Sequence, residues 1–112
     1  PFSVNLCSDE LDDKQDVYKH RWVSSHFRTF LLSTYKKINK ANFKDDEGNW
    51  MKRCEDQTLM LPIINKIHQE GGGTHHIDRP CYLYRGYQDI GGEAHKYQQG
   101  MEKFIRDRGY IE

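Results

Sequence analysis

The sequence predicts a small α+β domain of three main helices with a few short strands. Apolar residues recur every three to four positions in three separate stretches, which is the period of a helix that buries one face. Short β-prone runs lie at the start of the chain and between the last two periodic stretches. The 112 residues are enough for one core but not for two, so we expect residues 1–112 to form a single domain or a fragment of one.

The first elements are a strand and a helix. The alternating residues Phe2–Leu6 predict a strand, and the polar run 8–15 predicts a loop. A helix is expected at residues 25–38, with Ser24 or Ser25 as an N-cap whose hydroxyl accepts a bond from an unpaired amide. Its apolar face would consist of Phe27, Phe30, Leu31, Tyr35 and Ile38.

The second helix is expected to begin at Glu55 after a turn at residues 45–49, and to end at the glycines 71–73. Its apolar residues are Leu59, Met60, Ile63, Ile64 and Ile67. Because a proline inside a helix removes a backbone donor and clashes with the preceding turn, Pro62 predicts a kink or two short helices.

The last elements are a strand and a helix. Residues 81–84 follow Pro80 and are rich in β-prone side chains, which predicts an edge strand. Residues 94–108 carry apolar side chains at helical spacing, and Gly109 is the expected stop.

The charge balance narrows the function classes. Lysine plus arginine equals aspartate plus glutamate, 17 each, whereas a nucleic-acid binder normally carries a positive net charge. Residues 17–44 nevertheless hold seven basic residues and no acidic one, which indicates a solvated helix face or, as the sharper alternative, a phosphate or diphosphate site. Only 36% of the residues are hydrophobic, so part of the apolar surface is expected to meet another layer of protein.

Cysteine and histidine spacing gives no metal or disulfide signature. The three cysteines contain no CxxC pair, and the six histidines have no zinc-finger or HExxH spacing. We therefore expect a reduced, cytoplasmic setting. No apolar run approaches about 18 residues, so no membrane span is expected.

Two pairs of residues at helix starts are candidates for chemistry. Arg28 and His26 would add a guanidinium and an imidazole to helix amides that already favour an anion. Alternatively, Arg28 pairs with a carboxylate and His26 caps the helix. Glu55 and Asp56 could supply a general base, although acids at a helix start also suit the helix dipole without any catalytic role.

Two later segments are weaker candidates. His95 at the start of the last helix could contact a metal, or it could be a solvated side chain. Tyr84 and Arg85 belong to a cluster of tyrosines and arginines that suits a sugar surface or a protein interface, although the tyrosines could also be core residues.

Three stretches together resemble the C-terminal half of bacterial family-two glycosyltransferases, which are inverting enzymes of the GT-A type. Residues 19–38 (KHRWVSSHFRTF followed by YKKI) are similar to the family's W-x-x-S-H-L-R-T-F and K-K-I segments. Residues 54–63 (CEDQTLMLPI) are similar to D-x-A-x-M-x-P-M, and residues 77–85 (IDRPCYLYR) to I-P-x-x-L-Y-x-Y-N. The resemblance covers roughly residues 19–99.

The resemblance implies the C-terminal part of a GT-A-like α/β domain and assigns roles. Asp56 would be the base that deprotonates the acceptor hydroxyl, and Glu55 would help to position the acceptor. His95 matches a histidine near the donor diphosphate and its metal. The other substrate-binding positions would be Trp22, His26, Arg28, Tyr84 and Arg85.

A complete GT-A enzyme also needs an N-terminal half with a D-x-D metal motif, and no D-x-D follows an apolar strand here. We therefore expect an inactive fragment that works only when joined to its nucleotide-binding half or to a partner chain. A divalent metal, Mn or Mg, would serve the complete enzyme, with none expected in this chain alone. Its partners would then be a nucleotide-sugar donor and a glycan acceptor. The alternative is a non-catalytic binding or assembly module derived from the same fold.

Overall fold

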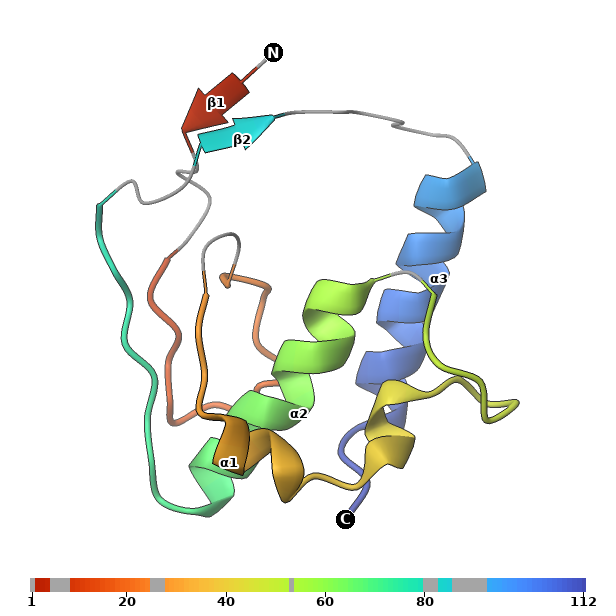
Figure 1. Cartoon of the computed structure of the whole chain (residues 1–112), viewed down its shortest axis with the longest axis horizontal. Coiled ribbons are helices and arrows are strands. Elements are labelled where there is room, and N and C mark those ends of the chain that lie inside the picture. The colour runs from red at the N-terminus through yellow and green to blue at the C-terminus, as the bar shows by residue number, and fades with distance from the viewer. Residues whose placement is uncertain (1, 5–8, 25–27, 53, 80–82, 86–92) are drawn as a thin grey trace.

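The computed structural model describes residues 2–4, 9–24, 28–52, 54–79, 83–85 and 93–112. In chain order, the elements of this part are β1 (Phe2–Val4), α1 (Leu32–Lys36), the 3-10 helix η1 (Lys40–Phe43), α2 (Glu55–Gln69), β2 (Leu83–Arg85) and α3 (Glu93–Arg108) (Figure 1). The protein is thus a small helical domain with three α-helices and very little strand across its described residues. Three helices with a few short strands agree with the expectation. A GT-A sheet is not among the described elements.

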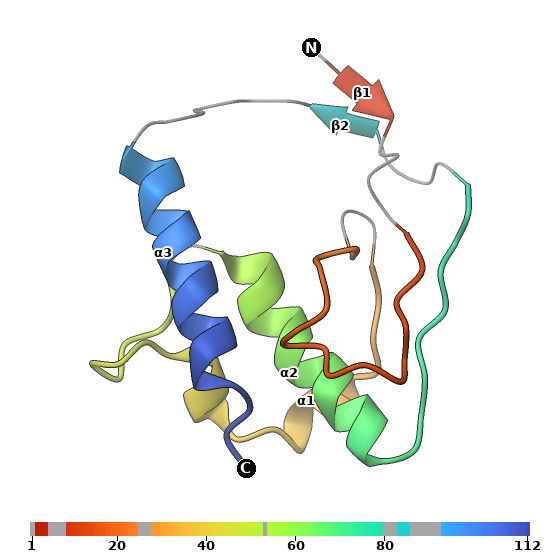
Figure 2. The ribbon, with the colours of Figure 1, turned by 180° about the vertical axis from the view of Figure 1, so that it is seen from behind.

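Helix α2 is the centre of the domain. It packs against α1, η1 and α3, and its side chains provide much of the buried core (Figures 1 and 2). Leu61, Ile63 and Ile64 are at most 2% exposed. Burying each aliphatic side chain contributes about 2 kcal/mol, so α2 owes its stability mainly to this packing.

Pro62 lies inside α2 without dividing it. The helix runs unbroken for 15 residues, so the expected division into two short helices is wrong. A proline in a helix interior costs about 3 kcal/mol. The neighbouring core side chains, Leu61 and Ile63, offset this cost. The helix ends where Gly71 takes a φ of 78°, and the amide of Gly72 bonds to the carbonyl of Ile67 at 2.8 Å.

The first helix is much shorter than expected. It covers Leu32–Lys36 and is preceded by non-helical residues 28–31, so the helix predicted at 25–38 is wrong over most of its length. Its N-cap residue is Leu31, which has no capping side chain, so Ser24 is not the cap. Residues 25–27, including Ser25, lie outside the described part of the chain.

The sequence periodicity of this segment failed because its apolar side chains find no partner surface. Phe30, Leu31 and Leu32 are 38%, 72% and 60% exposed. Without burial of an apolar face, a short helix is not stable in water. Only the later part of the predicted apolar face is buried, since Ile38 is 3% exposed.

The C-terminal residues are tied to the middle of the chain. Arg108 in the last turn of α3 donates to the carbonyls of Asn42 and Lys44 at 2.9 and 2.6 Å. The side chain of Asn42 in turn accepts from the amide of Ile111 and donates to its carbonyl, both at 2.8 Å. Gly109, with a φ of 72°, ends α3 as expected.

A second arginine, Arg106, connects α3 to residues 18–20 and to α2. Arg106 donates to the carbonyls of Tyr18 and His20 at 3.0 and 2.7 Å, and to the side chain of Gln57 at 3.1 Å. Because Tyr18 and His20 are buried, these bonds satisfy carbonyls that water cannot reach.

Strands β1 and β2 form one antiparallel ribbon, with Ser3 opposite Tyr84. The ribbon contacts no other described helix or strand and lies beyond the helices in both views (Figures 1 and 2). The strands expected at 2–6 and 81–84 are confirmed at residues 2–4 and 83–84, while residues 5–6 and 81–82 lie outside the described part. The expected turn at 45–49 is present, closed by the bond from the amide of Asp45 to the carbonyl of Asn49 at 2.8 Å. Within the described residues, no helix is both long and apolar enough to cross a membrane.

Candidate functional site

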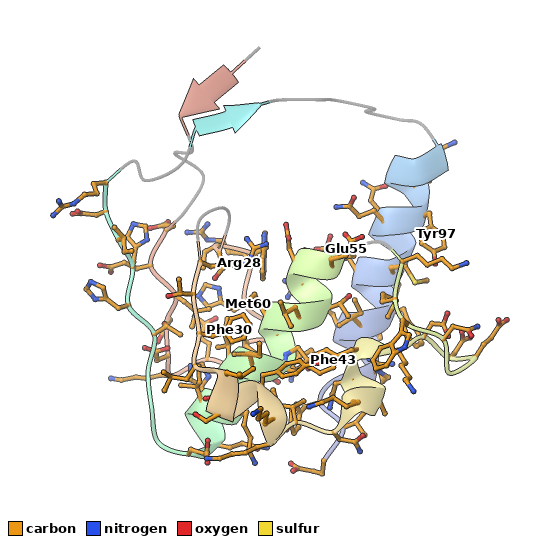
Figure 3. The ribbon with its side chains drawn as sticks, in the orientation of Figure 1. Arg28, Phe30, Phe43, Glu55, Met60 and Tyr97 are labelled. Carbon is orange, nitrogen blue, oxygen red and sulfur yellow. The ribbon has the colours of Figure 1, made fainter. Side chains whose placement is uncertain are left out.

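Two of the residues chosen from the sequence meet at the start of α2. Asp56 is the second residue of this helix, and Arg28 lies in the non-helical segment before α1. Their side chains form an ion pair between Nη2 of Arg28 and Oδ1 of Asp56. Figure 3 shows Arg28 at the same end of α2 as Glu55. Residues 28 positions apart in the sequence thus lie side by side.

The arginine is held in place by more than its partner carboxylate. Its Nη1 donates to the carbonyl of Ser24 at 3.2 Å, and its guanidinium carbon lies 6.0 Å from the ring centroid of Trp22. Trp22 itself is partly buried and packs against the core. The side chain of Arg28 is 19% exposed, whereas that of Asp56 is 47% exposed. The arginine is therefore the fixed member of the pair, and the carboxylate is open to solvent.

The backbone before Asp56 has an unusual conformation. Cys54, the N-cap residue of α2, has a φ of 61° and a ψ of 35°, the left-handed region that non-glycine residues rarely enter. Its side chain is 4% exposed, and burial raises the pKa of its thiol to about 11. Cys54 is therefore a neutral, buried anchor rather than a nucleophile. With Cys54 in this conformation, the chain changes direction, and Glu55 and Asp56 form the first turn of α2.

The first turn of α2 favours a carboxylate for electrostatic reasons. Its unpaired amides and the helix dipole are positive at this end. Glu55 and Asp56 are the two acids here, and Glu55 is exposed with no side-chain bond to the described residues. An ionised carboxylate, steadied by a guanidinium and open to solvent on one side, can accept a proton from a bound hydroxyl group or simply complement the helix end.

The other sequence candidates are not brought to this place by the described structure. His26 lies outside the described residues. Tyr84 and Arg85 are in β2, at the ribbon that touches no other described element, and their side chains are not among those described. His95 lies in the first turn of α3, and its side chain is likewise undescribed. The helix start expected beside Arg28 is wrong, because α1 begins at Leu32, and the alternative that Arg28 pairs with a carboxylate is confirmed by its ion pair with Asp56.

The described side chains offer few groups that could bind a metal ion. Within the described residues, no group of three or more histidine, cysteine, aspartate or glutamate side chains could hold a metal ion. The carboxylate of Asp56 is already paired with a guanidinium, which competes with any cation. The described residues around Asp56 therefore do not fit a metal centre.

A second polar cluster was missed by the sequence analysis. Asp13 accepts a hydrogen bond from Nε2 of His68 at 2.8 Å, and further bonds from the amide and hydroxyl of Thr74 at 3.0 and 2.8 Å. These bonds join Asp13 to residues that lie 55 and 61 positions later in the chain. The acidic run before residue 14 and the histidine late in α2 were both visible in the sequence, but no spacing rule connects them.

Comparisons with known proteins leave the resemblance as a sequence-level observation. No protein-family model, curated protein or solved structure matches the chain.

Proposed function

We propose that this chain supplies the acceptor side of an inverting glycosyltransferase, with Asp56 as the catalytic base. The observation that carries the proposal is the meeting of Trp22, Arg28 and Asp56 at the start of α2. These residues come from two separate stretches that resemble family-two enzymes. A resemblance without function would not require the two stretches to contact each other through their polar side chains.

In this proposal the two carboxylate oxygens of Asp56 divide the work. Oδ1 is bound by Arg28, which fixes the direction of the carboxylate. Oδ2 faces the acceptor hydroxyl and takes its proton as the hydroxyl oxygen bonds to the anomeric carbon of the donor sugar, while the bond from that carbon to the nucleotide diphosphate breaks on the opposite face. Glu55, exposed beside it, binds a second hydroxyl of the acceptor. The nucleotide sugar and its divalent metal belong to a nucleotide-binding half joined to this chain, and the assembly works in the cytoplasm.

The first prediction tests Asp56 in the complete transferase. Asp56→Asn keeps the shape of the side chain but removes its basicity, so turnover should fall by about 10²–10⁴-fold with little change in donor binding. Steady-state kinetics and donor titration measure both effects. Asp46→Asn, in the exposed turn at 45–49, is the matched control and should leave turnover unchanged. Near-normal turnover of Asp56→Asn would remove Asp56 from the catalytic role.

The second prediction tests Arg28. Lysine keeps the charge but cannot bond to a carboxylate and to the carbonyl of Ser24 with the same planar geometry. Arg28→Lys should therefore lower turnover by about tenfold or more while changing the free energy of unfolding by less than about 1 kcal/mol, since the carboxylate partner is half exposed. A thermal melt and a kinetic assay on this one variant separate the two roles. A loss of stability with normal kinetics would show that the pair is only structural.

A second candidate function is a non-catalytic binding or assembly module. The observation that favours it is the exposed apolar run Phe30–Leu32, which a partner protein could cover. Under this alternative, Leu31→Ser would abolish association with the partner, and Asp56→Asn would change nothing that can be measured. Under the transferase proposal, Asp56→Asn lowers turnover strongly, whereas Leu31→Ser has the smaller effect on turnover.

A further inference from the structure

A pocket of about 570 Å³ lies at the opposite end of α2 from Asp56. It is bordered by residues 13–19, by the last turns of α2 and by the end of α3. His68 lies twelve residues after Asp56 on the same helix, which corresponds to about 18 Å along the axis. The pocket is therefore separate from the proposed catalytic site, and the volume is within the range of small-molecule sites.

The most chemically defined wall of the pocket is His68. Its Nε2 is bonded to Asp13, and the amide and hydroxyl of Thr74 hold that carboxylate in turn. Burial alone would raise the pKa of Asp13, but the bonds from Thr74 and His68 outweigh it and hold that pKa below its ordinary value. The carboxylate is thus ionised at neutral pH, and Nε2 of His68 carries the proton that it donates.

This arrangement fixes the role of the other ring nitrogen. With Nε2 as the donor, Nδ1 of His68 is the ring nitrogen left for a ligand, and in the uncharged form of the ring it has a lone pair that accepts a hydrogen bond. No side chain or amide in the described part of the protein donates to it. A ring nitrogen that is held in one orientation beside a pocket is suited to bind a hydroxyl group of a ligand.

The charges around the pocket indicate what kind of ligand would enter. Three basic and three acidic side chains border it, so their formal charges cancel. These six residues are Lys14, Lys19, Arg106, Asp13, Asp16 and Asp107. Arg106 is already bonded to backbone carbonyls, and Asp107 is paired with Lys103. A balanced field of this kind gives no advantage to a strongly charged ligand.

The remaining wall offers amides and a phenol ring. Gln15, Asn65 and Gln69 border the pocket, and Tyr110 lies beside them. Amides both donate and accept, as sugar hydroxyls do, and an aromatic ring can cover the apolar face of a sugar ring. We propose that this pocket binds a neutral, polyhydroxylated ligand of monosaccharide size, with Nδ1 of His68 accepting a hydrogen bond from one ligand hydroxyl. This site does not depend on the proposed transferase function.

The test uses the full chain and a panel of probes. Methyl glycosides of glucose, galactose, mannose and N-acetylglucosamine are the neutral probes, and glucuronate and glucose 6-phosphate are the anionic ones. Binding is measured by ligand-observed NMR and by the ¹⁵N shifts of the His68 ring. We expect at least one neutral glycoside to bind with a Kd of about 1–10 mM and to shift the Nδ1 resonance of His68.

Two variants place the binding in the pocket. His68→Phe removes the acceptor, and Asn65→Trp fills the pocket without touching the bond between His68 and Asp13. Each substitution should raise the Kd by about tenfold or more. Lys36→Gln, on the exposed face of α1, is the control and should bind as the unaltered chain does. Circular dichroism shows whether each variant has kept its helices, and Asn65→Trp keeps the test valid if His68→Phe unfolds.

Three outcomes would overturn the proposal. The first is that no neutral glycoside shifts the His68 nitrogens at about 50 mM, well above the expected Kd. The second is binding that both folded variants retain, which would place the site elsewhere. The third is binding of the anionic probes alone with a steep loss in salt, which would make the pocket an anion site.

Discussion

The segment at residues 28–36 and helix α2 carry the same kind of sequence pattern but have different structures. Both have apolar residues at intervals of three and four. Helix α2 is a continuous helix with side chains such as Ile63 at 0% exposure, whereas the earlier segment has one short helix and leaves Leu31 at 72%. The difference shows that periodicity makes a helix possible, and that a surface to bury against makes it stable.

The polar side chains of the two segments explain why their structures differ. Helix α2 has two acids in its first turn, where the helix dipole favours them, and α1, η1 and α3 to pack against. The earlier segment has Arg28, whose side chain is turned toward Asp56 and Trp22. A chain directed by that ion pair stays non-helical as far as Leu31, and its apolar side chains point to solvent.

The largest expected effect tests burial directly. Ile63→Ala should lower the free energy of unfolding by about 2–5 kcal/mol, because the cavity forms in the tightest part of the core. Leu31→Ala shortens an apolar side chain that is largely exposed, so it should change the free energy of unfolding by no more than about 0.5 kcal/mol. Urea unfolding of both variants measures the contrast. Similar losses would mean that residues 28–32 are covered in solution.

A smaller effect concerns the far end of α2, where Asp13 ties the helix to two loops. Its folded-state pKa is lowered from the ordinary 3.8, so its contribution is complete above that value and is lost as the pH falls through the folded-state pKa. Asp13→Asn should be less stable than the unaltered chain by about 1 kcal/mol near pH 6, a modest amount because the carboxylate is partly exposed. The difference should narrow as the pH is lowered to about 2.

Thermal melts at the two pH values measure this difference. Asp46→Asn serves as the control, because this exposed carboxylate makes no hydrogen bond to the described residues. Its stability should follow that of the unaltered chain at both pH values. A constant deficit of Asp13→Asn across the range would show that its bonds do not depend on its charge.

The smallest effect would make the two segments more alike. Leu31 is the N-cap of α1 and has a φ of −78° and a ψ of 130°, which an aspartate cap also adopts. Leu31→Asp should therefore stabilise the domain by about 0.5–1 kcal/mol and lengthen the helical signal slightly. Chemical denaturation with circular dichroism measures both changes. A loss of stability would indicate that the leucine side chain is used by a contact with another molecule.

Local features were predictable where one pattern decided the structure. The bounds of α2 and α3, the stop at Gly109 and the turn at 45–49 follow from periodicity, glycine and turn residues. Pro62 was overestimated as a breaker, because the cost of one lost hydrogen bond is small beside the burial of its neighbours.

Features that depend on distant contacts could not be predicted from spacing. The sequence offered pairing of Arg28 with a carboxylate only as an alternative, and it did not identify Asp56 as the partner, since 28 residues separate the two. The bonds of Asp13 with His68 and Thr74 had no sequence signal at all, because each residue type is ordinary at a surface. The short α1 could not be anticipated either, since the burial that limits it is a property of the folded domain.

The tie between Asn42 and Ile111 has a consequence for the folding rate. The two residues are 69 positions apart, and their two hydrogen bonds form only when most of the chain has been brought together. Closing such a loop costs entropy before any contact repays it, so this step belongs late on the pathway. Asn42→Ala should then leave the refolding rate almost unchanged and speed unfolding, with a φ-value close to zero. The C-terminal tail would act as a latch on a domain that is already formed.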